Sequence, residues 1–132
     1  LFVHGGISLE FAFAGFDPTS VNTLMRKSIY KPKEKMDPLV LERYFGYYGP
    51  IWYRGYFEDN LSEARIDSIL TAAKVNHIVV GHTSQEQVKQ LYHHKIFAVD
   101  SSIKLGKYGE ILLIEEDRYT RGTPSGAVLE IE

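Results

Sequence analysis

The chain has 132 residues, a length that suits one domain with a substantial hydrophobic core. Its formal net charge is −2, with 44% apolar and 24% charged residues, so composition gives no reason to expect nucleic acid or a membrane as a partner. No apolar run approaches the length of a membrane span, and without Cys the chain has neither disulfides nor thiolate ligands. Any metal site would need His, Asp, Glu or Asn.

The first half of the chain contains two helix starts of the same kind. Asp17-Pro18 and Asp37-Pro38 each place an acidic N-cap before a proline at the first helical position. They predict one helix to about residue 30 and a second one ending near residue 46. Residues 31–36 form a charged loop between them. We expect this pair to be a helical insertion over about 17–47.

The second half alternates helix and strand patterns. Asn60 with Glu63 and Ser84 with Gln87 have the spacing of capping boxes, which predicts a helix through residues 66–73 and a short helix ending at His93-His94. Predicted strands cover residues 1–3, 77–80, 96–99, 111–114 and 127–131, with turns at 107–109 and 123–126. The acidic stretch at residues 115–117 is typical of a solvated turn.

These elements predict a single α/β domain over residues 1–132. Strands that alternate with helices indicate a mixed sheet with helices on one face, and the last strands indicate antiparallel hairpins. Aromatic side chains crowd residues 44–57, where residues 49–56 form a Gly- and Pro-rich irregular loop. The crowding fits a packed surface and a substrate cleft equally well.

Two histidines follow apolar strands and stand beside glycine. His4 precedes Gly5 and Gly6, and His82 follows Gly81. Glycine allows the backbone to approach a ligand closely, and ligands bind at the carboxyl ends of strands in open α/β sheets. Each histidine alone fits a structural role as well. The pair predicts a metal or phosphate site if the fold brings the two imidazoles together.

Arg54 is the candidate phosphate-binding residue of the aromatic loop, because a guanidinium can hold two phosphate oxygens at once. A surface Arg stacked on a neighbouring ring is the alternative. Asp100, at another strand end, fits a carboxylate ligand, a cap or a partner that orients a histidine. His93 and His94 are adjacent and so unsuited to chelate one ion, and His77 fits an edge position.

The motifs Phe-Val-His-Gly-Gly, Gly-Pro-Ile-Trp-Tyr-Arg-Gly, Val-Val-Gly-His-Thr and Phe-Ala-Val-Asp occur in this order along the chain. Together they resemble the carboxyl-terminal half of a calcineurin-like metallophosphoesterase, in particular the bacterial Shewanella-like members of the serine/threonine protein phosphatase branch. The resemblance implies half of a four-layer α/β/β/α sandwich. It also implies a two-metal hydrolase that cleaves phosphomonoesters.

By this resemblance His4 and His82 would bind one of two divalent ions, Mn, Fe or Zn, and Arg54 would hold the substrate phosphate. The family's upstream acidic and amide motifs do not occur in the sequence. We therefore expect the back part of a longer protein, inactive alone, with weak or absent metal. No complete set of catalytic residues is expected within it.

The expected partners are a phosphorylated protein or small phosphoester and the amino-terminal half of the same protein. An uncovered sheet would also favour self-association. A dinucleoside polyphosphate hydrolase and a non-catalytic binding module of the same fold are the alternatives. Both cytoplasm and periplasm fit the sequence.

Overall fold

The computed structural model describes residues 1–132, which divide into two compact units. The helical unit comprises Val3–Asn76, and the sheet unit comprises Leu1–Phe2 with His77–Glu132. Five α-helices and two sheets confirm the predicted α/β class. The single domain over residues 1–132, its insertion at about 17–47 and the helices on one face of the sheet stay predictions.

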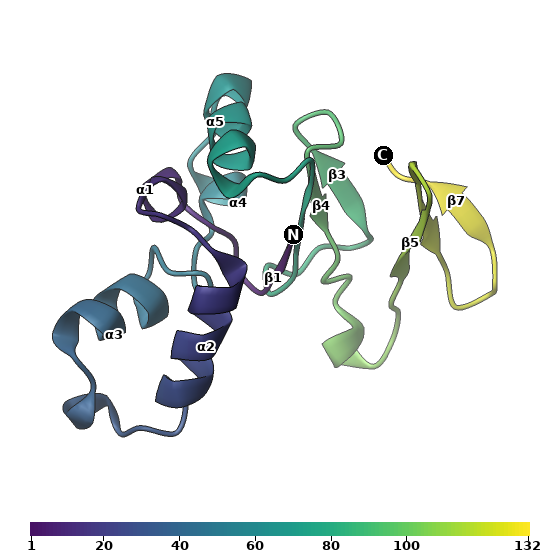
Figure 1. Ribbon diagram of the computed structural model, residues 1–132. Helices are drawn as coiled ribbons and strands as arrows, with labels where there is room; N and C mark the ends of the chain where they lie inside the picture. Colours follow the sequence, from purple (N-terminus) through teal and green to yellow (C-terminus); the bar gives the residue numbers. More distant parts are fainter. The chain divides into compact units, whose positions relative to one another are not determined.

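The helical unit confirms both of the predicted Asp-Pro helix starts. Asp17 accepts a hydrogen bond from the Ser20 N–H at 2.8 Å, and Asp37 accepts one from the Leu39 N–H at 2.8 Å. The loop between these helices contains a 3-10 turn that the sequence pattern did not predict. The helices, shown in Figure 1, are α1 (Leu9–Phe13), α2 (Pro18–Ser28), α3 (Pro38–Phe45), α4 (Gly55–Glu58) and α5 (Glu63–Ala73), with the 3-10 turn η1 (Lys33–Lys35).

Helix α5 was predicted correctly, but its cap was not. The Ser62 hydroxyl accepts from the Arg65 N–H, whereas Asn60 lies two residues earlier with a φ of 45°. Helix α1 was missed, because five residues hold too few turns to show periodicity. Its N-cap is Ser8, whose hydroxyl accepts from the Phe11 N–H at 3.0 Å.

The first sheet of the sheet unit has the strand order β1-β2-β4-β3. Strand β2 runs parallel to β4, and β3 runs antiparallel to β4, so the sheet is mixed as predicted. The helix predicted from Ser84 to His94 is wrong, because this stretch contains β3, where Leu91 pairs with Ile96. The strands are β1 (Phe2–Val3), β2 (Ile78–Val80), β3 (Lys89–Leu91) and β4 (Ile96–Ala98).

The second sheet is antiparallel, as predicted, but contains one strand more than expected. It consists of β5 (Ile111–Glu115), β6 (Arg118–Gly122) and β7 (Val128–Glu130), in that order, preceded by the 3-10 turn η2 (Ile103–Leu105). The turn predicted at residues 107–109 is not the hairpin turn, which lies in the acidic stretch between β5 and β6. Strand β6 was missed because its sequence is mainly polar.

Aromatic rings pack beside the core of the sheet unit. The ring of Phe97, which is fully buried, stacks on Tyr119 at 4.5 Å between centroids. The ring of His77 lies 4.9 Å from Tyr119, and His77 Nδ1 is 2.8 Å from the carbonyl oxygen of His94. His77 therefore has a structural role.

Glu110 connects the loop before β3 to the second sheet. Its side chain has no exposed surface, and its Oε2 accepts from the Val88 N–H at 2.8 Å. Its Oε1 accepts from Arg121 Nη1 at 2.6 Å and also from the Tyr108 hydroxyl. Burial raises the pKa of Glu110, but the hydrogen bonds from Tyr108, Val88 and Arg121 outweigh it, so the pKa lies below its ordinary value.

No helix of the structure has the length and apolarity needed to cross a membrane.

Replacing Glu110 by Gln should lower the free energy of unfolding by about 3 kcal/mol, because it removes one partner of a buried ion pair and leaves Arg121 unbalanced. Chemical denaturation followed by circular dichroism measures this loss. Glu86→Gln, at an exposed position, is the matched control and should change stability by less than about 0.5 kcal/mol. Equal losses in both variants would contradict the role of Glu110.

The contribution of Glu110 should also depend on pH. Because its pKa is lowered in the folded chain, the stabilisation is complete above the pKa of the unfolded carboxyl and is lost as pH falls through the folded value. The difference in unfolding free energy between the wild type and Glu110→Gln should therefore shrink from neutral pH towards pH values below about 4. Denaturation curves at several pH values measure this difference. A difference in unfolding free energy that does not change with pH would contradict a charged Glu110 in the folded chain.

Candidate functional site

The His-Gly-Gly motif and the aromatic loop, far apart in sequence, meet within the helical unit. The Gly5 N–H donates to the carbonyl oxygen of Pro50 at 2.8 Å, and the Gly6 N–H donates to the same oxygen at 3.3 Å. Both glycines and Pro50 are buried. The segment that carries His4 is thereby held against the loop that carries Arg54.

Only glycine fits at the first of these positions. A Cβ on Gly5 would lie 2.4 Å from the carbonyl oxygen of Ile51 and 2.9 Å from Arg54 Nη1. A Cβ on Gly6 would lie 2.9 Å from ring carbons of both Tyr53 and Tyr56. The His-Gly-Gly motif can therefore pack against the aromatic loop only because glycine occupies both positions.

The aromatic residues that follow Trp52 are structural. Tyr53 and Tyr56 are 3% exposed, with their rings edge to face at 5.3 Å. The Tyr56 hydroxyl donates to the carbonyl oxygen of Ile7 at 2.8 Å. For these two residues the packed-surface interpretation of the aromatic stretch is correct.

Arg54 is held by the loop in which it lies. Its Nη1 donates to the carbonyl oxygens of Tyr53 at 2.9 Å and Ile51 at 3.4 Å, and its Cζ lies 6.0 Å from the centre of the Trp52 ring. Neither Nε nor Nη2 makes a protein hydrogen bond. This edge of the guanidinium has the two parallel donors that bind an oxyanion.

The surroundings of Arg54 leave it cationic. Partial burial lowers the pKa of the guanidinium. Electrostatic interaction with Glu58, and to a smaller extent with Tyr47, raises the pKa and partly offsets this effect. Arginine nevertheless remains protonated in proteins. Glu58 is itself bound, since the Tyr47 hydroxyl donates to its Oε2 at 2.8 Å. The sequence does not reveal this pair, because its members are eleven positions apart and neither belongs to a motif.

His82 lies in the sheet unit, just past the carboxyl end of β2. Its φ of 61° is in the left-handed region, which is uncommon for a residue with a side chain. The hydroxyl oxygen of the next residue, Thr83, is buried with no hydrogen-bond partner. This loop combines an unusual backbone conformation with an unsatisfied polar atom, which is typical of functional sites.

Asp100 follows β4 and connects the loops after β2 and β4. Its Oδ1 accepts from the Ser102 N–H at 3.0 Å, and its Oδ2 accepts from the Ser84 hydroxyl at 3.0 Å. The turn or cap interpretation of Asp100 is therefore confirmed. Ser84 serves this contact and caps no helix.

His4 belongs to the helical unit and His82 to the sheet unit, so their convergence stays a prediction. Within the helical unit the structure brings the His4 segment and Arg54 together. No group of three or more His, Cys, Asp or Glu side chains could hold a metal ion. His93 and His94 are exposed.

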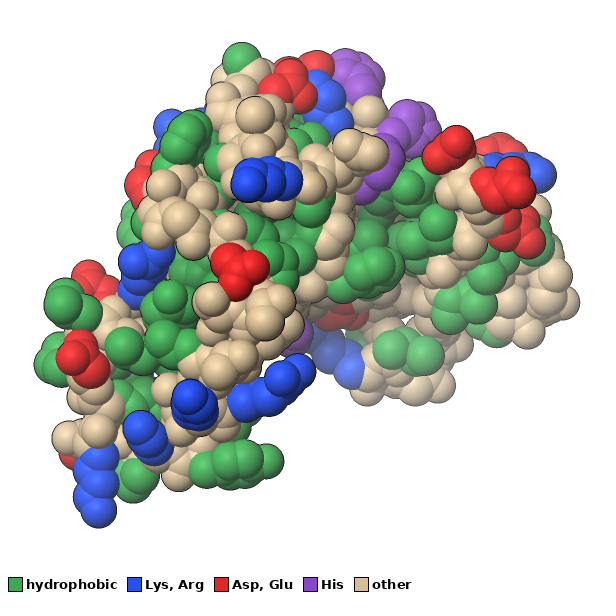
Figure 2. All heavy atoms as spheres, in the orientation of Figure 1, with side chains coloured by type: hydrophobic (Ala, Val, Ile, Leu, Met, Phe, Trp, Pro, Cys, Tyr) green, Lys and Arg blue, Asp and Glu red, His purple; other side chains and the backbone are tan.

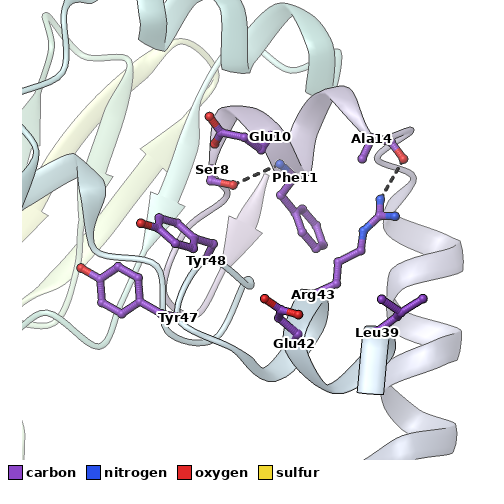
Figure 3. Close-up of a pocket in the computed structure, with 9 residues that line it drawn as sticks. All are labelled: Ser8, Glu10, Phe11, Ala14, Leu39, Glu42, Arg43, Tyr47 and Tyr48. Carbon is purple, nitrogen blue, oxygen red and sulfur yellow. Dashed lines mark hydrogen bonds between the residues drawn. The ribbon is translucent and has the colours of Figure 1, made fainter. Parts of the chain in front are cut away.

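A pocket that the sequence did not reveal lies between α1 and α3. It has a volume of about 640 Å³. Figure 3 shows the ring of Phe11 pointing toward α3, with Tyr47 and Tyr48 together on the other side. Arg43 closes another side by donating to the carbonyl oxygen of Ala14 at 2.8 Å. Tyr47 thus links the pocket to Glu58 and the surroundings of Arg54.

No protein-family model matches the chain. An uncharacterised protein of Schizosaccharomyces pombe is 36% identical over 89 residues, which cover 64% of this chain and 25% of that protein. Among solved structures, a cold-active protein-tyrosine phosphatase of a psychrophilic Shewanella species is 46% identical over 99% of the chain, with a TM-score of 0.92. A second structure of a cold-active protein tyrosine phosphatase is 48% identical over 96% of the chain, with a TM-score of 0.89. The chain spans about 40% of the length of these solved structures.

These comparisons correct the class of phosphatase inferred from the motifs. The solved structures are named protein-tyrosine phosphatases, so the assignment to the serine/threonine branch of the calcineurin-like metallophosphoesterases is wrong. The dinucleoside polyphosphate hydrolase and the non-catalytic binding module gain no support either. The two divalent metal ions, Mn, Fe or Zn, were part of that assignment and are corrected with it. The motifs indicated phosphate chemistry but did not identify the phosphoester.

Gly5→Ala should displace residues 49–54, because the added Cβ would meet a backbone oxygen. Trp52 is the single Trp of the chain, so its fluorescence emission reports this displacement directly. We expect a shifted emission maximum and a loss of stability of at least about 2 kcal/mol. As a control, Gly106→Ala has open space around its Cβ and should cost only about 1 kcal/mol for its φ of 68°, with unchanged emission. Unchanged emission in Gly5→Ala would rule out the close contact.

Proposed function

We propose that this chain is part of a phosphatase that removes phosphate from phosphotyrosine in proteins. The observation that carries this proposal is the similarity, over 99% of the chain, to solved protein-tyrosine phosphatases. The Nε and Nη2 edge of Arg54, which makes no protein hydrogen bond, supports it as well, since such a fork can hold two phosphate oxygens. As those structures are longer, we propose that the two units described here belong to a larger α/β domain.

Arg54 is the proposed phosphate-binding residue. Its Nη1 is occupied by backbone carbonyls, which fix the plane of the guanidinium and aim the Nε and Nη2 edge outward from this anchor. A cation held in advance stabilises charge that develops on the phosphoryl oxygens without reorganising during the reaction. The role of Gly5 is to provide space for this arrangement.

His4 and His82 are each proposed to take part in the reaction. His4 directly precedes Gly5 and so lies beside the Arg54 loop, and His82 is at the carboxyl end of a strand in a left-handed conformation. Histidine is a common general acid or base in catalysis. Both residues are therefore expected to be necessary for turnover, and His82→Ala should abolish it.

The pocket between α1 and α3 is the proposed binding site for the protein substrate beside its phosphorylated residue. Tyr47 and Tyr48 are exposed, and Phe11 and Leu39 give the pocket apolar walls. Aromatic walls of this kind bind side chains with large contact area. We also propose two protein partners, the amino-terminal portion of the same protein and a second copy of this chain.

Arg54→Lys in the full-length protein should lower kcat/KM for a phosphotyrosine peptide by roughly 100-fold or more, because Lys keeps the charge but loses the two parallel donors. The measurement is phosphate release under steady-state conditions. Arg118→Lys is the matched control, since Arg118 pairs with Glu130 on the second sheet and should leave kcat/KM unchanged.

The substrate class is tested by comparing phosphotyrosine and phosphoserine versions of one peptide. Preference for phosphotyrosine together with the loss in Arg54→Lys supports the proposal. Full activity in Arg54→Lys would remove Arg54 from the site. Absence of hydrolysis of both peptides by the folded wild type would contradict the proposal.

A further inference from the structure

The segment between α2 and α3 concentrates positive charge on a chain whose net charge is negative. Residues 26–35, here called the basic segment, carry five cations and one carboxylate, which gives a net charge of +4. The whole chain has a net charge of −2. Figure 2 shows Lys and Arg side chains gathered over α2 and the segment that follows it. The five cations are Arg26, Lys27, Lys31, Lys33 and Lys35.

None of these five cations has a partner within the protein. All are exposed, and no hydrogen bond or ion pair joins any of their side chains to another residue. Elsewhere in the chain, arginines are bound: Arg65 pairs with Glu10 at 2.8 Å, and Arg121 pairs with Glu110. The basic segment therefore gathers five unpaired cations within ten residues.

The charge of α2 explains only part of this arrangement. Arg26 and Lys27 lie in the last turn of α2, where cations interact favourably with the helix dipole. Lys31, Lys33 and Lys35 lie beyond the helix and gain nothing comparable. Mutual repulsion among neighbouring cations is unfavourable for the free chain, so an anionic partner would relieve it.

A groove of about 490 Å³ lies against the basic segment. Hydroxyl and ammonium groups line it together with the side chains of Leu24 and Val40, so it offers both hydrogen-bond donors and apolar contact to an extended chain with acidic side chains. The lining residues include Ser20, Thr23, Leu24, Lys27, Lys31 and Val40.

Two apolar side chains stand beside the cations. Ile29 is 60% exposed and Tyr30 is 94% exposed, directly after α2. Exposed aromatic side chains next to positive charge are typical of surfaces that bind another protein. Ile29 and Tyr30 would add contact area to the electrostatic attraction.

We propose that the basic segment and the adjoining groove bind a carboxylate-rich segment of another protein. Charge complementarity carries this proposal, since five exposed cations give residues 26–35 a net charge of +4, and the adjoining groove offers hydroxyl and ammonium donors to the carboxylates of an extended peptide. The interaction does not depend on the phosphatase activity. In a phosphatase it would recruit acidic protein substrates at a place remote in sequence from Arg54.

The test uses the full-length protein and a fluorescently labelled twelve-residue peptide of Glu, Asp and Tyr. Fluorescence anisotropy measures the dissociation constant, with the corresponding Gln, Asn and Tyr peptide as comparison. We expect binding of the acidic peptide only, weakened at least tenfold between about 0.05 M and 0.5 M salt as the charges are screened.

The paired variant Lys27→Glu/Lys31→Glu should weaken binding at least tenfold. The control Lys104→Glu/Lys107→Glu makes the same change of net charge at exposed positions of the sheet unit and should bind as the wild type does. Tyr30→Ser should weaken binding by a smaller factor. Circular dichroism and thermal unfolding verify that each variant is folded.

Three results would overturn the proposal. The first is absence of binding by the wild type, and the second is equal weakening in both paired variants, which would reveal an effect of net charge alone. The third is tighter binding to phosphatidylserine vesicles or to a twelve-nucleotide single-stranded DNA than to the acidic peptide. Either of these last ligands would assign the segment to a membrane or to nucleic acid.

Discussion

The contact of Gly5 with the Pro50–Ile51 backbone is the constraint on which the candidate site depends. The Gly5 N–H satisfies the carbonyl oxygen of Pro50, and the missing side chain lets this strand end lie against the loop that holds Arg54. The loop in turn supplies the carbonyl oxygens that orient the guanidinium. A backbone hydrogen bond and a steric requirement thus convert two separate motifs into one arrangement of a histidine segment and an arginine.

The structure was predictable from sequence where the cause was local. Asp17 and Asp37 start their helices because a side-chain oxygen reaches an N–H two or three residues away, and this needs no tertiary information. The stretch from Ser84 to His94 has equally good local capping spacing, yet its backbone pairs with β4 and the Ser84 hydroxyl binds Asp100. Strand pairing overrode the local preference there. The polar side chains of β6 show no strand pattern in the sequence, and the strand forms because it pairs with β5 on one side and β7 on the other.

The candidate site shows the same division. His4, His82 and Arg54 could be selected from short motifs, because glycine next to histidine and an arginine in an aromatic loop indicate close backbone approach and oxyanion binding. The Tyr47–Glu58 pair and the pocket beside α3 could not, because they arise from contacts between separate segments of the folded chain. The phosphoester was beyond the motifs as well. An arginine contacts only the phosphate oxygens, which are alike whichever side chain carries the phosphate. The substrate class therefore depends on surfaces that the motifs do not describe.

The two kinds of cation in the helical unit differ in a physically meaningful way. Arg54 is partly buried and bound to two carbonyl oxygens, which costs mobility but fixes its donors in advance, and preorganisation is what stabilisation of a developing charge needs. The cations of residues 26–35 are exposed and unpaired, which suits attraction over a distance set by the ionic strength. Rigid placement of one cation and loose placement of several therefore correspond to two different tasks, binding one phosphate precisely and attracting an acidic chain.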